Sequence, residues 1–192
     1  MNTYIALLRG INLGGNNIIK MEDLRKVIVN LDYSNVKTYI QSGNVVLQTK
    51  RKNIEELQSE IHSTIANNFG LSIPIIVIEA RELREIIDSN PFLEDKNNDP
   101  KYFHFTFLNE ESTNVNTFSL NGYRGATEEF KINGKNIYLY LYLYLYLYLP
   151  EGYGNTQLNN NFFERALNRI ATTRSLKTVS KLLAMVDELG VE

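Results

Sequence analysis

The sequence predicts an α+β fold of two tandem ferredoxin-like subdomains of the βαββαβ type, the second ending in an extra C-terminal helix. Two observations lead to this prediction. Short β-rich runs alternate with segments of helical periodicity, and the order found in the first half approximately recurs in the second. The predicted ranges are 1–80 for the first subdomain, 81–100 for a connecting helix and linker, and 101–192 for the second subdomain.

The first half contains four predicted strands and two predicted helices. The strands are expected at 3–8, 36–41, 45–49 and 75–79. One helix starts at Met21, and the other follows the N-cap Asn53 and ends at Gly70. The first two strands of such a unit run parallel, so the loop after the first strand and the hairpin turn Ser42-Gly43-Asn44 should converge at one edge of the sheet.

The second half follows a helix at 80–89, which stops before Asn90-Pro91 because a residue preceding proline avoids the helical region. Its elements are predicted as a strand at 102–108, a short helix at 110–118, a hairpin at Asn133-Gly134, a strand at 137–149, and helices through 158–167 and 176–189. In this assignment a helix stands where the final strand would be. The three phenylalanines of Tyr102–Phe107 share the face expected to meet the core.

Residues 138–149 alternate tyrosine and leucine, which places the tyrosines on one face of an extended strand and the leucines on the other. The run from Ile137 to Leu149 is much longer than a typical strand, so we expect it to overhang its neighbours or to bulge. A slip of two residues leaves the pattern unchanged, so the register is poorly fixed. An unpaired edge here could pair with a second copy of the chain.

Composition excludes several functional classes. A net charge of −2 argues against bulk nucleic-acid binding, which usually requires a basic excess. The chain has no cysteine, so disulfides and thiolate zinc sites are absent, and its two distant histidines have no metal-ligand spacing. No signal-peptide pattern or membrane-length apolar run is found. We therefore expect a cytoplasmic protein without a membrane partner.

The loop after the first strand, 9–17, is rich in glycine and asparagine but fits neither common phosphate-binding motif. Gly10 and Gly15 have P-loop spacing, yet Asn16-Asn17 replace the lysine and hydroxyl residue of that motif. The dinucleotide fingerprint fails because Asn12 stands at its second glycine.

A weaker anion site remains open at the converging loops. Its candidate residues supply two cations, backbone amides and neutral polar groups; they are Arg9, Gly10, Asn12, Gly14, Gly15, Asn16, Lys20, Gln41, Ser42, Gly43 and Asn44. Thr173 and Arg174 form a second anion candidate before the last helix. The alternative is that all these residues build tight turns, satisfy backbone groups or cap a helix. No catalytic residue and no cofactor can be named.

Several segments together resemble the bacterial family called domain of unknown function 1697. They are Tyr4–Gly15, Thr38–Val46, Pro150–Gly154, Phe162–Glu164 and Ala171–Arg174, so the resemblance covers nearly the whole chain. It implies two related α/β subdomains and brings no established activity and no agreed catalytic residues. The chain departs from the family at Leu176, where a tryptophan is expected, and at the Tyr-Leu repeat, much of which looks inserted.

The leading hypothesis is a protein that binds a small anionic or nucleotide-like ligand at the loop after the first strand. Two alternatives stay open. One is an enzyme of unknown reaction that uses the same cleft and needs a general acid or base there. The other is a protein or RNA interaction module that uses the basic C-terminal helices.

Overall fold

The computed structural model describes residues 1–111, 129–133 and 142–190 of the chain. The chain forms two compact units, Met1–Glu85 with Ser180–Glu192, and Ile86–Val179. Each unit contains one four-stranded antiparallel sheet with helices, so the fold is mixed α/β.

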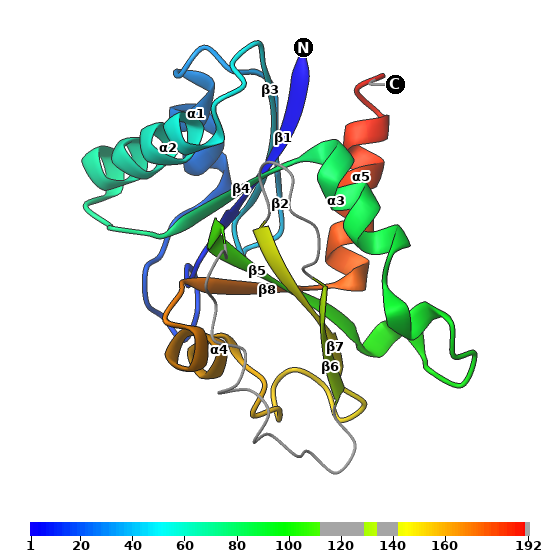
Figure 1. The fold of residues 1–192 in the computed structure, drawn as a ribbon. Helices are drawn as coiled ribbons and strands as arrows, with labels where there is room; N and C mark the ends of the chain where they lie inside the picture. Colours follow the sequence, from blue (N-terminus) through cyan, green and yellow to red (C-terminus); the bar gives the residue numbers. More distant parts are fainter. Residues whose placement is uncertain (112–128, 134–141, 191–192) are drawn as a thin grey trace. The chain divides into compact units, whose positions relative to one another are not determined.

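The sheet of the first unit has the strand order β2-β3-β1-β4 (Figure 1). Its strands are β1 (Asn2–Leu8), β2 (Ser34–Tyr39), β3 (Asn44–Thr49) and β4 (Ile75–Glu79). Neighbouring strands pair antiparallel throughout. Because β1 and β2 both run antiparallel to β3, they are parallel to each other, as the sequence predicted.

Helices α1 (Met21–Val29) and α2 (Ile54–Phe69) cover one face of this sheet (Figure 1). The predicted caps of α2 are confirmed. The Asn53 side chain accepts a hydrogen bond from the Glu56 amide at 3.1 Å, and Gly70 ends the helix in the left-handed conformation at φ 68°. The core between helices and sheet includes Leu24, Ile61 and Val77, and all three are fully buried.

The opposite face of the first sheet is also buried, since Ile5, Leu7 and Ile78 are inaccessible to solvent. Helix α3 (Ala80–Asp88) follows β4 directly, and residues 180–187 of the C-terminal helix α5 (Leu176–Asp187) belong to this unit. Arg84 on α3 forms an ion pair with Asp187, and Lys37 on β2 forms one with Glu188 at 3.0 Å. Residues 180–192 therefore group with the first half of the chain, whereas the sequence assigned them to the second subdomain, 101–192.

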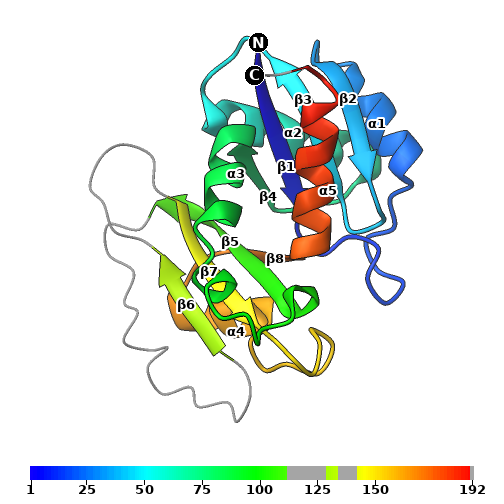
Figure 2. The ribbon, with the colours of Figure 1, turned by 90° about the vertical axis from the view of Figure 1, so that its right-hand side faces the viewer.

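The sheet of the second unit has the order β6-β7-β5-β8 (Figure 2). Its strands are β5 (Phe103–Glu111), β6 (Glu129–Asn133), β7 (Tyr142–Tyr148) and β8 (Ala171–Ser175), and its helix is α4 (Asn160–Leu167). Two short 3-10 turns, η1 (Pro91–Leu93) and η2 (Pro100–Tyr102), lead into β5. The β6–β7 pair is antiparallel, as predicted, whereas Gly134 of the predicted turn lies outside the described residues.

Two sequence assignments in the second unit are corrected. The prediction that a helix replaces the final strand is wrong, because Ala171–Ser175 pairs antiparallel with β5 along its whole length. The sequence does not predict this strand because its polar threonines and Arg174 give no apolar alternation. The predicted helix at 110–118 also fails at its start, since β5 continues through Glu111; residues 112–118 lie outside the described part of the chain.

The described part of the Tyr-Leu repeat confirms the predicted separation of its faces. Leu145 and Leu147 pack with Phe163 of α4, whereas Tyr146 contacts Phe105 on the opposite face, with ring centroids 5.7 Å apart. Leu145 is paired with Thr106 on one side and with Ile132 on the other. Residues Tyr144–Tyr148 are paired on both sides and therefore form no open edge; residues 137–141 lie outside the described residues.

Among the helices that the structure describes, none has the length and apolar character needed to cross a membrane.

Candidate functional site

The loop after β1 and the turn between β2 and β3 meet at one edge of the first sheet, which confirms their predicted convergence. The Leu8 amide at the end of β1 donates a hydrogen bond to the Gly43 carbonyl at 2.8 Å. The following amide, that of Arg9, donates to the Pro74 carbonyl at 2.9 Å. The start of the loop is thus held by hydrogen bonds to two other segments, one at Gly43 and one at Pro74, directly before Gly10.

Asn12 joins the two loops. Its side-chain Nδ2 donates to the Gln41 carbonyl and to the Ile19 carbonyl, both at 2.9 Å, and its Oδ1 accepts from the Ile19 amide at 2.9 Å. These bonds use both Nδ2 hydrogens and the oxygen. Asn12 also adopts φ 53°, a region that asparagine tolerates better than most residues. Its side chain is therefore structural, as the turn-building alternative predicts.

The tip of the loop is a small hairpin with Gly14 and Gly15 at its centre. The Asn16 amide donates to the Leu13 carbonyl at 3.0 Å, and the two glycines have φ values of 55° and 80°. Positive φ at both central positions is the requirement of a type I′ turn, which explains the Gly-Gly pair. The Asn17 side chain closes the base by donating to the Gly10 carbonyl at 3.0 Å.

Gly43 is the closest packing point between the two loops. It has φ 75°, and a Cβ added there would lie 2.6 Å from Ile11 Cδ1 and 2.8 Å from Leu8 Cβ. The next residue, Asn44, is fully buried, and its side chain donates to the Tyr39 carbonyl at 2.9 Å and to Ser42 Oγ at 3.1 Å. Gly43 therefore allows the two loops to pack closely, and the buried Asn44 side chain holds the turn by hydrogen bonds and does not face a ligand.

The outward surface of this loop pair carries large apolar side chains that the sequence analysis did not select. Leu13, Ile18 and Ile40 are 59%, 61% and 46% exposed, respectively. Ile40 also has φ 46°, an unfavourable conformation for a β-branched residue. An apolar residue inside a glycine-asparagine turn, as at Leu13, was the sequence signal that could have indicated this surface.

The two predicted cations of the site differ in exposure. Lys20 is exposed and stands immediately before α1, whereas Arg9 is half-buried. The acidic residues of the first turn of α1, Glu22 and Asp23, both contact Lys26, and the hydrogen bond from Lys26 is the main cause of the lowered pKa of Glu22. Lys20 takes part in no ion pair within the described ranges.

Thr173 and Arg174 lie on β8 in the second unit, not in a loop before a helix. Arg174 is buried; its guanidinium donates to Thr172 Oγ1 at 2.7 Å and to the Thr173 carbonyl at 3.0 Å. Ser175 caps the start of the last helix, since its Oγ accepts a hydrogen bond from the Thr178 backbone amide at 3.3 Å.

The clearest shifted titrations lie away from the two loops. Burial, together with a hydrogen bond to Glu60, strongly raises the pKa of the Tyr33 phenol. The Arg51 guanidinium lies 2.7 Å from the same Glu60 carboxylate and 5.6 Å from the centre of the Tyr33 ring. This group joins Tyr33, which precedes β2, and Arg51, which follows β3, to Glu60 on α2, and it has a structural role. Within the described residues, no group of three or more histidine or acidic side chains could hold a metal ion.

Comparison with known proteins identifies a family without a known activity. A family model described as a protein of unknown function (DUF1697) matches residues 1–138, which include both loops of the site. No curated protein matches the sequence. A conserved bacterial protein from Streptococcus pneumoniae has a similar structure, with a TM-score of 0.72 and 22% sequence identity over 96% of this chain and 98% of that chain. Because the family model matches well over half of its length, the chain belongs to the DUF1697 family.

Proposed function

We propose that the two joined loops of the first unit bind a small anionic, nucleotide-like ligand. One observation carries the proposal: the Asn12 side chain locks both loops together, so the glycine turn and its neighbouring side chains are held in place before any ligand arrives. A site ordered in advance avoids the entropy cost of ordering loops on binding.

The glycine turn supplies the anion-binding part of the proposed site. Gly14 and Gly15 are exposed, and their amides donate to no acceptor among the residues that the structure describes. Successive backbone amides in a turn can form a concavity that binds anions. Lys20 adds a positive charge to the same loop segment. Phosphate or carboxylate groups match this combination.

The exposed apolar side chains supply the second part of the proposed site. Leu13 and Ile18 lie on the glycine loop, and Ile40 adjoins Gln41, which Asn12 bonds directly. Apolar surface next to anion-binding amides suits a ligand with a charged group and a planar or apolar group, as in a nucleotide. These side chains explain why we favour a nucleotide-like ligand over a bare inorganic anion.

Calorimetry with AMP, ribose 5-phosphate and inorganic phosphate would test this proposal. We expect AMP to bind most tightly, and Lys20→Ala to weaken its binding about tenfold through loss of a charged contact. Lys52→Ala is the matched control, because Lys52 is also exposed but precedes α2. The proposal fails if none of the three compounds binds the folded protein, or if the two lysine variants behave alike.

A protein partner is the second candidate, and the same three exposed side chains favour it. Protein interfaces gain most from buried apolar contacts, and anion binding does not require them. A Leu13→Ser, Ile18→Ser variant that binds AMP normally would leave this apolar surface without a role in ligand binding and support the second candidate. An enzyme at this place would need an acid or base, and neither loop carries a histidine or a carboxylate.

We further propose that each unit has a ferredoxin-like arrangement and that the protein acts in the cytoplasm. The order β2-β3-β1-β4 with two helices supports the arrangement for the first unit, and β6-β7-β5-β8 with α4 supports it for the second. Absence of cysteine is consistent with a reducing compartment. Self-association through the Tyr-Leu segment would have to use residues outside Tyr144–Tyr148, which are paired with β5 on one side and with β6 on the other.

A further inference from the structure

A polar cluster occupies part of one face of the second sheet. His104 and Thr106 on β5 stand opposite Ser175 and Thr173 on β8, so the four side chains share this face. Asn160, the first residue of α4, joins them from the same unit. Leu145 and Leu147 of β7 pack on this face as well, so polar groups are concentrated next to an apolar core.

Hydrogen bonds within the cluster run in one direction. Thr173 Oγ1 donates to Asn160 Oδ1 at 2.6 Å, because an amide oxygen can only accept. The 2.8 Å contact between Thr106 Oγ1 and Thr173 Oγ1 is then a bond donated by Thr106. Asn160 Oδ1 is the last acceptor in this series of hydrogen bonds. The Nδ2 group of the Asn160 side chain has no partner among the described residues.

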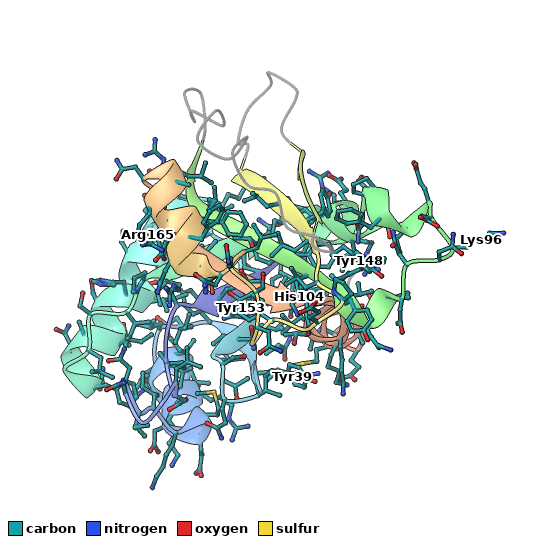
Figure 3. All side chains as sticks on the ribbon, turned by 90° about the horizontal axis from the view of Figure 1, so that it is seen from below. Tyr39, Lys96, His104, Tyr148, Tyr153 and Arg165 are labelled. Atoms are coloured by element: carbon teal, nitrogen blue, oxygen red, sulfur yellow. The ribbon has the colours of Figure 1, made fainter. Side chains whose placement is uncertain are left out.

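Tyr153 covers His104 (Figure 3). The ring centroids are 5.4 Å apart and the planes differ by 26°, which is a stacked geometry. The phenol oxygen of Tyr153 accepts a hydrogen bond from the backbone amide of Asn160 at 3.3 Å, so the phenol proton is still available for donation. Tyr153 thereby links the strand residue His104 to the start of α4, and its side chain is half-buried.

The hydrogen-bonding state of His104 follows from its neighbour. Nδ1 lies 3.0 Å from the Tyr102 carbonyl, and a carbonyl only accepts, so Nδ1 carries the proton. Nε2 is then an acceptor without a partner in the described part of the chain. Burial lowers the pKa of His104, which keeps the ring neutral at pH 7.

These contacts leave two donors and one acceptor unused: Asn160 Nδ2, the Tyr153 hydroxyl and His104 Nε2. They come from three segments of the chain that the ring stack and the Asn160–Tyr153 bond hold together. No charged side chain is a hydrogen-bonding partner of these three residues in the described structure. Neutral ligands with both donors and acceptors fit such a set, whereas phosphates lack a cation here.

We propose that His104, Tyr153 and Asn160 form a second binding site, for a neutral planar ring with hydrogen-bonding edges, of the nucleobase class. Single bases are commonly held by stacking on tyrosine or histidine, with hydrogen bonds to the base edge. The half-buried Tyr153–His104 stack supplies the aromatic surface, and the three unused groups supply the edge contacts. This site does not depend on the glycine loop.

Nitrogen NMR of the imidazole rings gives a direct test, because the chain has only two histidines. We would add adenosine, guanosine, cytidine and uridine, which carry no phosphate. Binding of at least one nucleoside should move the Nε2 resonance of His104 and leave His62, on α2 of the first unit, unchanged. Tyr153→Phe retains the stack and loses the phenol proton, so the affinity of that nucleoside should fall about five- to tenfold.

Lys20→Ala is the control variant, and it should bind the nucleoside normally because Lys20 belongs to the first unit. The proposal is overturned if no nucleoside moves the His104 resonance in the folded protein, or if inorganic phosphate moves it equally. It is also overturned if Tyr153→Phe binds as tightly as the unmodified chain. Loss of AMP binding in Lys20→Ala with nucleoside binding intact would separate this site from the glycine loop.

Discussion

The glycine loop of the first unit and the His104 cluster of the second use polar groups in opposite ways. In the glycine loop, the side chains of Asn12 and Asn17 bond the backbone of the two loops, and the amides of the exposed Gly14 and Gly15 donate to no acceptor in the described chain. In the cluster, the strands satisfy the backbone, and side chains keep unused hydrogen-bonding groups. The side chains of a conspicuous sequence motif can thus serve mainly to hold the structure, while less conspicuous residues keep hydrogen-bonding groups available for a ligand.

The largest effect expected at the two joined loops comes from Gly43→Ala, in the turn that packs against the glycine loop. The added Cβ would meet Leu8 Cβ at 2.8 Å in a left-handed backbone, so we expect the free energy of unfolding to fall by about 2–5 kcal/mol. Gly70→Ala is the control, because Gly70 has a similar φ of 68° and open space around it. Urea denaturation should show a smaller loss there, about 1–2 kcal/mol. Equal losses would contradict the packing role of Gly43.

Asn12→Ala should have the next largest effect, because it removes the bonds that join the two loops. We expect a loss of about 1–3 kcal/mol in the free energy of unfolding. Asn16→Ala changes an exposed side chain of the same loop and should cost less than about 0.5 kcal/mol. If the two variants unfold at the same urea concentration, Asn12 is not the residue that holds the loops together.

Ile40→Asn, unlike the two variants above, should stabilise the protein. Asparagine tolerates the positive φ of position 40 better than a β-branched residue, so we expect a gain of about 1 kcal/mol. Ile18→Asn removes a similarly exposed isoleucine that lacks a positive φ, and it should change stability little. A gain in stability together with weaker AMP binding would show that the isoleucine serves the ligand site.

The smallest expected effect is a change in how stability depends on pH, and it tests the His104 cluster of the second unit. Burial lowers the pKa of His104 in the folded protein, so below its ordinary value of 6.5 the unfolded chain binds more protons. The contribution of His104 to stability is therefore complete above pH 6.5 and decreases as the pH falls through the lowered value. Urea midpoints at pH 7.5 and 5.5 should differ less in His104→Gln than in His62→Gln. Identical differences would refute a buried neutral His104.

Much of the first unit could be predicted from sequence because its signals are local. The cap Asn53, the terminator Gly70 and the Ser42-Gly43-Asn44 turn each act on their immediate neighbours. The meeting of the two loops also followed from the order of the elements, since that order makes β1 and β2 parallel. Which atoms of the asparagines would remain available could not be predicted, because it depends on contacts such as Asn12 with Gln41.

The second unit was harder to predict because its important contacts join distant residues. β8 has a polar sequence and is recognised only through its pairing with β5, for example Thr173 with Thr106. The His104 cluster likewise combines residues 104, 153 and 160, and no motif spacing relates them. Sequence predicted the faces of β5 correctly, since Phe103, Phe105 and Phe107 are all buried.

The two-residue period of β7 has a consequence for the gene as well as for the sheet. Leu145 and Leu147 pack with α4 while Tyr146 contacts Phe105, so leucine and tyrosine enter different layers there. Gain or loss of one whole pair preserves which layer every later side chain enters, whereas a single-residue change reverses them all. Repeat copying errors that add or delete six nucleotides are therefore the changes in length that this strand can tolerate.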